Sequence, residues 1–262
     1  MKVKNLLLFT IMFLFAAGAA AFAQTLDELL AEGDNYTEQF NDQKAFETYQ
    51  KADTLFPNNW KVYWRLSRAT VDIAEHMPTS TDEQEDAQEA KFHKALKYAE
   101  KSVELDSTKS VTYLRVAIAN GKIALFKGVF SVGGIVNSGR DACEKAIALN
   151  NGGNYIQAIA HYVLARTHAK VSTKWAPARS ILGLGWADLD SALVHYKIAE
   201  KLKPNFVMIE LDYARALMRD DKYKLAKEKL EKAIAAPIQD EDDEAKKAEA
   251  KKLLVEVNEE LE

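Results

Sequence analysis

The chain is poor in residues that interrupt helices and in residues that build disulfide or metal frameworks. Its 262 residues include 11 glycines, 5 prolines and one cysteine. Scarce glycine and proline disfavour β-sandwiches and barrels, because such folds need many turns. The single cysteine, Cys143, excludes an intramolecular disulfide and any metal site built from several cysteines.

An excess of positive charge is also absent. The chain has 35 Lys and Arg against 39 Asp and Glu, for a formal net charge of −4. It therefore lacks the broad basic footprint of a nucleic-acid-binding protein, and we expect no nucleic-acid partner. The composition is 48% hydrophobic and 28% charged, which is typical of a folded chain with a sizeable core.

The first 23 residues have the features of a secretory signal peptide. Lys2 and Lys4 give a basic start, residues 5–26 carry no charge, and Ala21-Phe22-Ala23 supplies a small-residue end. We expect cleavage near Ala23 and a mature chain that is exported to the periplasm or secreted. Retention of this segment as a membrane anchor is the alternative, and no later segment is apolar enough to span a membrane.

The rest of the chain has the apolar period of amphipathic helices. Alanine, leucine, lysine and glutamate dominate it, and all four are good helix formers. Capping boxes are predicted at Thr25–Glu28 and Ser80–Glu83. Pro57, Pro204 and Pro237 each close a helical stretch. The sequence therefore predicts an all-α protein.

A spaced set of small and large residues recurs along the chain. It reads alanine, tyrosine, alanine, leucine and proline at steps of four, three, three and two residues, starting at Ala45 and again at Ala192. Looser copies start at Ala95, Gly139 and Ala226. Small residues let two helices of a hairpin cross closely, and large ones fill the space between neighbouring hairpins. The sequence thus predicts a repeated helical hairpin.

This pattern resembles the tetratricopeptide repeat (TPR), whose period is about 34 residues. The resemblance implies an α-α superhelix of about five hairpins with a capping helix that covers the last repeat. The repeats are expected at approximately 25–57, 58–107, 108–151, 152–204 and 205–238, with the capping helix at 242–262. This last helix is expected to turn inward Ala245, Ala248, Leu254, Val257 and Leu261. Extra residues are expected near Met77–Ala90, Lys127–Ser138 and Val171–Asp188, and the glycine-rich stretch 128–140 is expected to be a flexible insertion.

The stretch Tyr63–Ala69, the insertions and the closing segment Ala236–Leu254 resemble the regulator of microtubule dynamics family, which has bacterial and eukaryotic members. The resemblance implies a TPR fold, no active site and a ligand in the groove, since the TPR domain of a mitochondrial outer-membrane relative is reported to bind phospholipid. The export signal departs from the eukaryotic pattern. We therefore expect a bacterial exported branch and carry over no microtubule role.

The sequence contains no catalytic or metal-binding motif, and we expect no enzyme activity, cofactor or metal. His161 and His168 lie seven residues apart but lack further ligands at zinc-site spacing. Cys143 has no base placed beside it, and the glycine-rich stretch lacks the Gly-Lys-Ser/Thr of a phosphate loop. The acidic run 240–244 is expected to favour a helix N-terminus, with calcium binding as the alternative.

The concave face of a TPR superhelix is lined by the first helix of each hairpin. Counting along one helical face from the small residue of each copy gives large apolar groups and four arginines. The alternative is a register one residue out, in which these apolar groups are core. The candidate groove residues are Trp64, Arg68, Leu114, Ile118, Tyr162, Arg166, Leu211, Arg215, Met218 and Arg219.

Arginine is the side chain best shaped for carboxylate or phosphate. The sequence therefore predicts a non-catalytic exported scaffold that binds a protein or peptide partner, including one with a free carboxylate, in its groove. The alternative is a carrier for a lipid or an amphipathic anionic small molecule, including a periplasmic component associated with a transporter.

Overall fold

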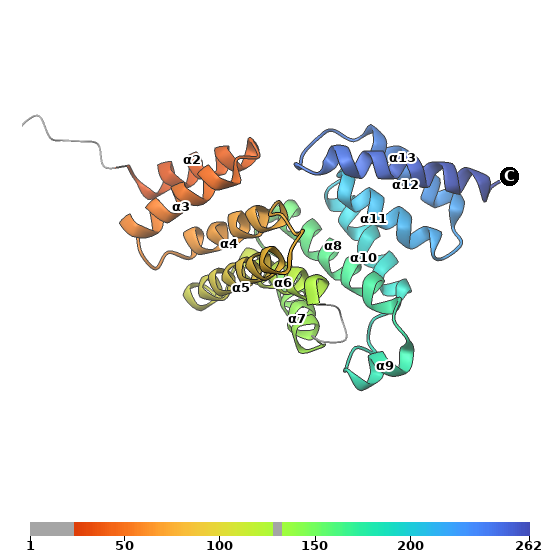
Figure 1. Cartoon of the computed structure of the whole chain (residues 1–262), viewed down its shortest axis with the longest axis horizontal. Coiled ribbons are helices and arrows are strands. Elements are labelled where there is room, and N and C mark those ends of the chain that lie inside the picture. Colours follow the sequence, from red (N-terminus) through yellow and green to blue (C-terminus); the bar gives the residue numbers. More distant parts are fainter. Residues whose placement is uncertain (1–23, 128–132) are drawn as a thin grey trace, which may run out of the picture.

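The described part of the chain is built from helices. The computed structural model describes residues 24–127 and 133–262, and within these ranges it contains no strand (Figure 1). The predicted signal peptide, residues 1–23, lies outside the described residues. The all-α prediction is confirmed.

Within these ranges the long helices pair into five hairpins. The hairpins are α2 (Leu26–Glu38) with α3 (Asp42–Leu55), α4 (Trp60–Glu75) with α5 (Asp82–Leu105), α6 (Ser110–Lys127) with α7 (Gly133–Leu149), α8 (Gly153–Ser172) with α10 (Leu189–Leu202), and α11 (Val207–Met218) with α12 (Tyr223–Ala235). A short helix, α9 (Ala176–Ile181), lies between α8 and α10, and α13 (Asp243–Glu259) packs on the last hairpin. The predicted superhelix of five hairpins and a final helix is confirmed.

The repeated small and large residues lie where the helices cross. In the first hairpin Gly33 faces the ring of Tyr49, and both are buried. In the fourth hairpin Ala192, Tyr196 and Ala199 are buried in the same order. Their burial removes apolar surface from water at every hairpin, which is the main favourable contribution to folding.

One of the two predicted capping boxes has the expected residues. Thr25 accepts a hydrogen bond from the backbone N–H of Glu28, and the Glu28 carboxylate accepts one from the N–H of Thr25. The second prediction is wrong by one residue. The N-cap of α5 is Thr81, whose hydroxyl accepts from the N–H of Gln84, and this shift satisfies the same free donors of a helix start.

The prediction of a flexible insertion at 128–140 is wrong for its second half. Residues 133–140 form the first turns of α7, whereas 128–132 lie outside the described residues. Val136 packs in a buried cluster with Val171 and Leu184, and the side chain of Asn137 accepts a hydrogen bond of 2.8 Å from the indole N–H of Trp186. These contacts stabilise a helix that its glycines alone would disfavour.

The register of α13 differs in part from the sequence pattern. Val257 is buried and Leu254 half-buried, as predicted, but Ala245, Ala248 and Leu261 are exposed. Ala250 is buried in place of the predicted alanines. Helix α13 packs against α11 and α12, so that the last hairpin gains the neighbour it otherwise lacks.

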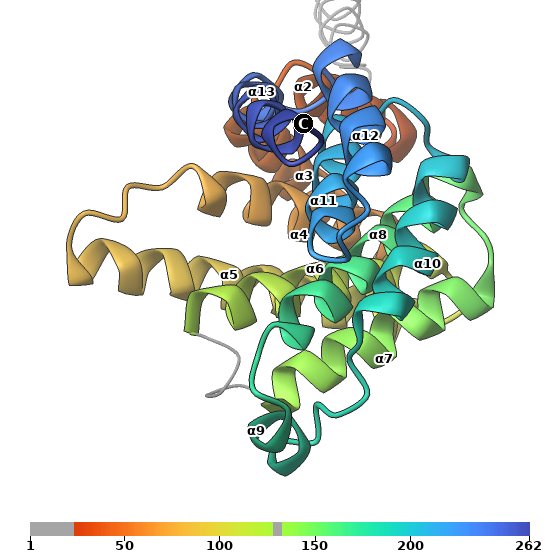
Figure 2. The same ribbon diagram turned by 90° about the vertical axis from the view of Figure 1, so that its right-hand side faces the viewer.

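The hairpins curve so that the loop before α13 approaches the arm made by the first helices. Figures 1 and 2 show the loop before α13 close to the end of the arm made by α2, α3 and α4, while α9 projects from the opposite side of the molecule. The result is an incomplete ring with the first helices of the hairpins toward its inside. This arrangement places side chains from distant parts of the sequence around one space.

Three histidines meet between α8 and α10. Nδ1 of His161 lies 2.8 Å from Nδ1 of His195, so that one imidazole donates and the other accepts when both are neutral. The ring of His168 stacks on that of His195 at 6.0 Å. Burial and the charge of His195 lower the pKa of His161 to about 4, and burial also lowers the pKa of His195.

Acid should therefore destabilise this hairpin. The unfolded histidines bind protons near pH 6.5 but the folded ones do not, so stability is lost as the pH falls from about 6.5 toward 4. Because His161 is only about half-buried, solvent screening weakens the effect, and we expect His161→Gln to reduce this loss by about 1 kcal/mol in urea unfolding at pH 4.5 compared with pH 7. Val255→Ser, an exposed change of a side chain that does not titrate, is the control and should leave the pH dependence unchanged. Equal slopes for wild type and His161→Gln would contradict the assignment.

Candidate binding pocket

A pocket of about 320 Å³ lies on the inside of the ring. It is lined mainly by α4, α6 and α8, and it is completed by the start of α7, the start of α11 and the loop before α13. Its apolar lining includes Val71, Ile118, Leu125, Ile135, Ile159, Val163, Phe206 and Met208. A mostly apolar hollow with a few convergent polar groups is the usual form of a ligand site.

Basic side chains outnumber acidic ones in this lining. Six are basic and four are acidic, although the chain as a whole is acidic. The basic ones are Arg68, Arg115, Lys122, Arg166, Lys170 and Lys246, and the acidic ones are Asp72, Glu75, Asp240 and Asp242. The pocket lining therefore carries a net positive formal charge in a chain whose net charge is negative.

Arg115 is the least solvated of these basic groups. It is 7% exposed, its Nε has no hydrogen-bond partner, and its guanidinium carbon lies 5.7 Å from the ring centroid of Trp64. Burial and the nearby charge of Arg68 lower the pKa of Arg115 to about 10, so it stays charged at neutral pH. A buried guanidinium donor without an acceptor is costly, and an anionic ligand group would supply one.

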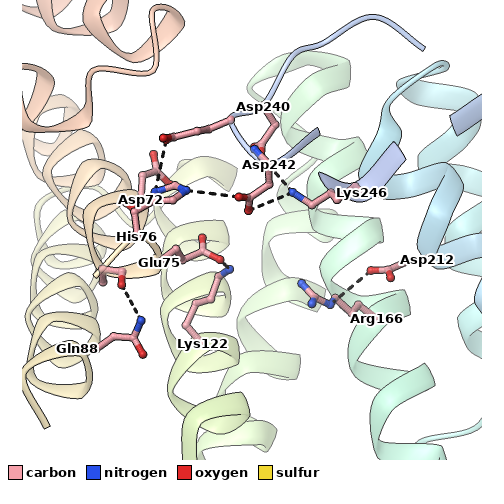
Figure 3. Close-up of polar contacts among 12 residues, drawn as sticks. Asp72, Glu75, His76, Gln88, Lys122, Arg166, Asp212, Asp240, Asp242 and Lys246 are labelled. Carbon is pink, nitrogen blue, oxygen red and sulfur yellow. Dashed lines mark hydrogen bonds and ion pairs between the residues drawn. The ribbon is translucent and has the colours of Figure 1, made fainter. Parts of the chain in front are cut away.

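Two ion pairs hold the wall formed by α4 and α6. Nε of Arg68 lies 3.6 Å from Oδ2 of Asp72 on the same helix, and Lys122 of α6 pairs with Glu75 of α4 (Figure 3). Burial raises the pKa of Asp72 to about 6, although Arg68 opposes the shift. Asp72 is therefore mostly ionised at pH 7 and pairs with Arg68, whereas Arg115 beside them forms no ion pair among the described residues.

The opposite wall is held by Asp212 of α11. Its carboxylate accepts a hydrogen bond of 2.7 Å from the hydroxyl of Tyr162 and lies 3.5 Å from Nε of Arg166. Figure 3 shows Arg166 of α8 directed toward Asp212. Asp212 also pairs with Arg215 and is 6% exposed. One buried carboxylate thus fixes two pocket side chains of the preceding repeat.

The loop before α13 closes the ring against α4. Nδ1 of His76 lies 2.9 Å from the carbonyl oxygen of Asp72 and 3.4 Å from Oε2 of Glu241, and Nε2 lies 3.5 Å from Oδ1 of Asp242 (Figure 3). Burial opposes the charged form, but the hydrogen bond to Asp72 and the carboxylates of Glu241 and Asp242 raise the pKa of His76. The closure is therefore strengthened when His76 is protonated.

Asp42 joins this contact from the start of α3. Potential ligand atoms of Asp42, His76 and Glu241 lie within 4.8 Å of one another. Burial and the charge of Glu241 raise the pKa of Asp42. Both nitrogens of His76 already face protein oxygens, so the geometry assigns the cluster to closing the ring. The acidic run 240–244 thus contacts His76 and Lys246, in addition to placing Asp243 and Glu244 in the first turn of α13.

The structure brings four of the ten predicted groove residues into the pocket. These are Arg68, Ile118, Tyr162 and Arg166. The other six lie elsewhere for two reasons, core burial and engagement with other parts of the chain.

Leu114 and Leu211 are buried in the core between hairpins, which is the alternative register considered for the apolar groups. Met218 packs half-buried against the same core. The prediction that Leu114 and Leu211 face an open groove is therefore wrong, because the first helices pack on one another over that part of their surface. Met218 does not line the pocket.

The remaining three are polar or aromatic side chains with other partners. The guanidinium of Arg65 stacks over the ring of Trp64, and the distance from the guanidinium carbon to the ring centroid is 4.2 Å. Arg215 pairs with Asp212 and Glu249, and Arg219 donates a hydrogen bond of 2.6 Å to the carbonyl of Ala169. These groups stabilise the scaffold instead of lining the pocket.

Sequence reasoning missed Arg115 and the loop 240–246. The sequence does mark Arg115 as unusual, because it is the only charged residue in the mostly apolar stretch 111–119. The loop had none, since its approach to His76 joins positions more than 160 residues apart. Tyr155, Phe206 and Met208 were missed for a different reason, because they lie at or just before helix starts, outside the helical face that was counted.

The fold and the inner pocket define a TPR superhelical protein. Solved structures with this fold include a thermophilic TPR protein from Thermus thermophilus, with a TM-score of 0.60 and 16% identity, covering 86% of this chain and 98% of that chain. The type IV pilus biogenesis factor PilW is similar with a TM-score of 0.52 and 13% identity, covering 91% of this chain and 93% of that chain. At these identities the likeness concerns the fold alone.

The chain belongs to the regulator of microtubule dynamics protein 1-3 family, whose model matches residues 29–258. It is 26% identical over 251 residues to regulator of microtubule dynamics protein 1 of Bos taurus, covering 90% of this chain and 73% of the relative. The protein of the same name from Mus musculus is 26% identical over 242 residues, covering 87% and 74%. The family resemblance seen in the sequence is confirmed.

A search of the described helices for a membrane span finds none that combines the required length and apolarity.

Proposed function

We propose that the protein is a non-catalytic TPR scaffold that binds a segment of a partner protein in the pocket inside its ring. Arg115 carries the proposal, because it is buried beside Arg68 at the pocket wall with an Nε donor that has no acceptor. An apolar segment would pack on Ile118 and Phe206 while an anionic end, such as a C-terminal carboxylate, meets the two arginines. The fold neighbours and the family support a scaffold role.

The test uses peptides displayed with free C-termini and selected on the protein. We expect Arg68→Gln to weaken the selected peptides roughly 10- to 100-fold in fluorescence polarisation, because a hydrogen bond to a charged group contributes about 1.5–3 kcal/mol. Amidation of the peptide C-terminus should cause a similar loss. Lys224→Gln, an exposed change on α12 outside the pocket, is the matched control. Equal affinity of wild type, Arg68→Gln and Lys224→Gln would contradict the proposal.

Native mass spectrometry separates the scaffold from the carrier that the sequence left open. A carrier retains its lipid or small molecule through purification, whereas a peptide-binding scaffold is recovered at the mass of its own chain. We expect the bare mass. A retained molecule that is lost in Ile118→Asp, with the protein still folded, would favour the carrier and contradict the scaffold.

We also propose that the protein is exported and cleaved near Ala23, on the basis of its basic start, uncharged run and small-residue end. Mass analysis of the chain from the envelope fraction of a bacterial host tests this. We expect an N-terminus at Gln24, and recovery of an uncleaved chain in the membrane would instead indicate an anchor.

A further inference from the structure

Basic residues are concentrated in the middle of the chain. Between Asp106 and Asp188 there are ten lysines and arginines and only two acidic residues, Asp141 and Glu144. The segments on both sides of this stretch have more acidic than basic residues. The charge is thus segregated within a protein whose formal net charge is −4. Six of the ten are buried or ion-paired, and the other four, Lys145, Lys170, Lys174 and Arg179, form no ion pair among the described residues. Unpaired basic side chains attract anionic surfaces.

The most exposed large apolar side chains lie in the same stretch. Ile181 is 85% exposed and Trp175 is 72% exposed, the two highest values for large hydrophobic residues of the described chain. Both flank or end the short helix α9, which projects from the ring in Figures 1 and 2. An exposed tryptophan and isoleucine at a projecting tip are unfavourable in water unless another surface covers them.

The segment that contains α9 packs against the core of the protein. Leu184 and Ala187 are buried against Val136 and Val171. Nε of Arg179 donates a hydrogen bond of 3.0 Å to the carbonyl of Lys174, which closes the loop around α9. The backbone that carries Trp175 and Ile181 is therefore held in position, so their exposure is a property of the fold.

Positive charge surrounds this tip. Lys174 is exposed on the chain that leads into α9. Arg179, within α9, donates its hydrogen bonds to main-chain carbonyls, which leaves its charge unneutralised by those contacts. Asp188 is the nearest acidic residue along the sequence. Its carboxylate caps α10 by accepting a hydrogen bond from the backbone N–H of Ser191.

We propose that the α9 tip, made of Trp175, Ile181, Lys174 and Arg179, docks on an anionic phospholipid surface. Tryptophan is favoured at the level of lipid headgroups, and isoleucine adds apolar area that enters the acyl boundary. Each lysine or arginine near an anionic bilayer strengthens binding about fivefold, so the apolar and the basic signals act together. The docking is independent of the pocket, which lies on the inside of the ring, and it leaves that pocket open to a partner.

Co-sedimentation with vesicles tests the proposal. The probes are vesicles of phosphatidylcholine alone and vesicles with roughly one third phosphatidylglycerol, mixed with the chain that begins at Gln24. We expect binding to the anionic vesicles that weakens as salt is raised, and little binding to the neutral ones. The double variant Trp175→Ser, Ile181→Ser should reduce anionic partitioning at least about tenfold, and Lys174→Glu, which reverses one charge at the tip, should reduce it at least about fivefold.

The matched control is Val194→Ser with Val255→Ser, two exposed valines outside the tip, which should bind as wild type does. Brominated acyl chains should quench the tryptophan emission of wild type but not that of Trp175→Phe, which reports insertion directly. Equal binding to both vesicle types, or unchanged binding of the folded tip variants, would overturn the proposal. Failure of all vesicle binding would do so as well and would assign the tip to a protein surface.

Discussion

Replacing Asp212 with alanine should lower the free energy of unfolding by about 3–5 kcal/mol, because it leaves buried charged and polar groups without their partner. Asp212 accepts the hydrogen bond of Tyr162 and pairs with Arg166 and Arg215, so one substitution affects three side chains in two repeats. Urea denaturation at neutral pH measures the change.

A double-mutant cycle with Tyr162→Phe separates the hydrogen bond from the ion pairs. Tyr162→Phe removes only the hydroxyl and should cost about 1 kcal/mol in the wild-type background and close to nothing in Asp212→Ala. Asp190→Ala, an exposed change at the start of α10, should alter stability by less than about 0.5 kcal/mol. A cost below about 1 kcal/mol for Asp212→Ala would show that this carboxylate does not join the fourth and fifth hairpins.

Gly33→Ala should destabilise the first hairpin by about 1–3 kcal/mol, even though alanine is the better helix former. An added Cβ at Gly33 would lie 2.2 Å from Cε1 of Tyr49, a buried ring that cannot move aside freely. Moving the ring would also break the 2.7 Å hydrogen bond from the Tyr49 hydroxyl to Asp34, which in turn binds Arg65 of the next repeat. The loss should therefore spread from α2 and α3 into α4.

Gly121→Ala is the matched control, since it also replaces a glycine inside a helix. No atom lies within 4 Å of a Cβ added at Gly121, so the change should stabilise the protein by about 0.5–1 kcal/mol. Urea unfolding and hydrogen exchange of the amides in α2 and α3 measure both variants. If both substitutions raised the free energy of unfolding by the same amount, the close packing of Gly33 on Tyr49 would not exist in solution.

The helices and their pairing could be predicted from the sequence because the determinants are local and repeated. Ala45, Tyr49 and Ala52 recur at fixed steps as Ala192, Tyr196 and Ala199, and each set marks one crossing of two helices. A pattern that occurs several times constrains the fold more strongly than any single helix propensity. The short helix α9 had no such repeat and was not predicted.

The pocket could be predicted only in part because its geometry depends on side-chain register and long-range closure. Arg68 and Arg166 were found because they share the inner face with the small residues of their repeats. Leu114 was misplaced because the first helices of successive hairpins pack on one another, which buries part of that face. Closure by Glu241 and Asp242 against His76 depends on the curvature of all five hairpins, which no local pattern encodes.

The most direct measurement of the central claim is site-specific photocrosslinking of a selected peptide. A photoreactive amino acid would replace Leu125 at the pocket or Leu225 on α12, two leucines with nearly equal exposed fractions of 49% and 45%. If the inside of the ring receives the partner, crosslinks form from position 125 and are competed by unlabelled peptide, whereas position 225 gives none. Crosslinking from position 225 alone, or equally from both positions, would place the partner elsewhere and contradict the account.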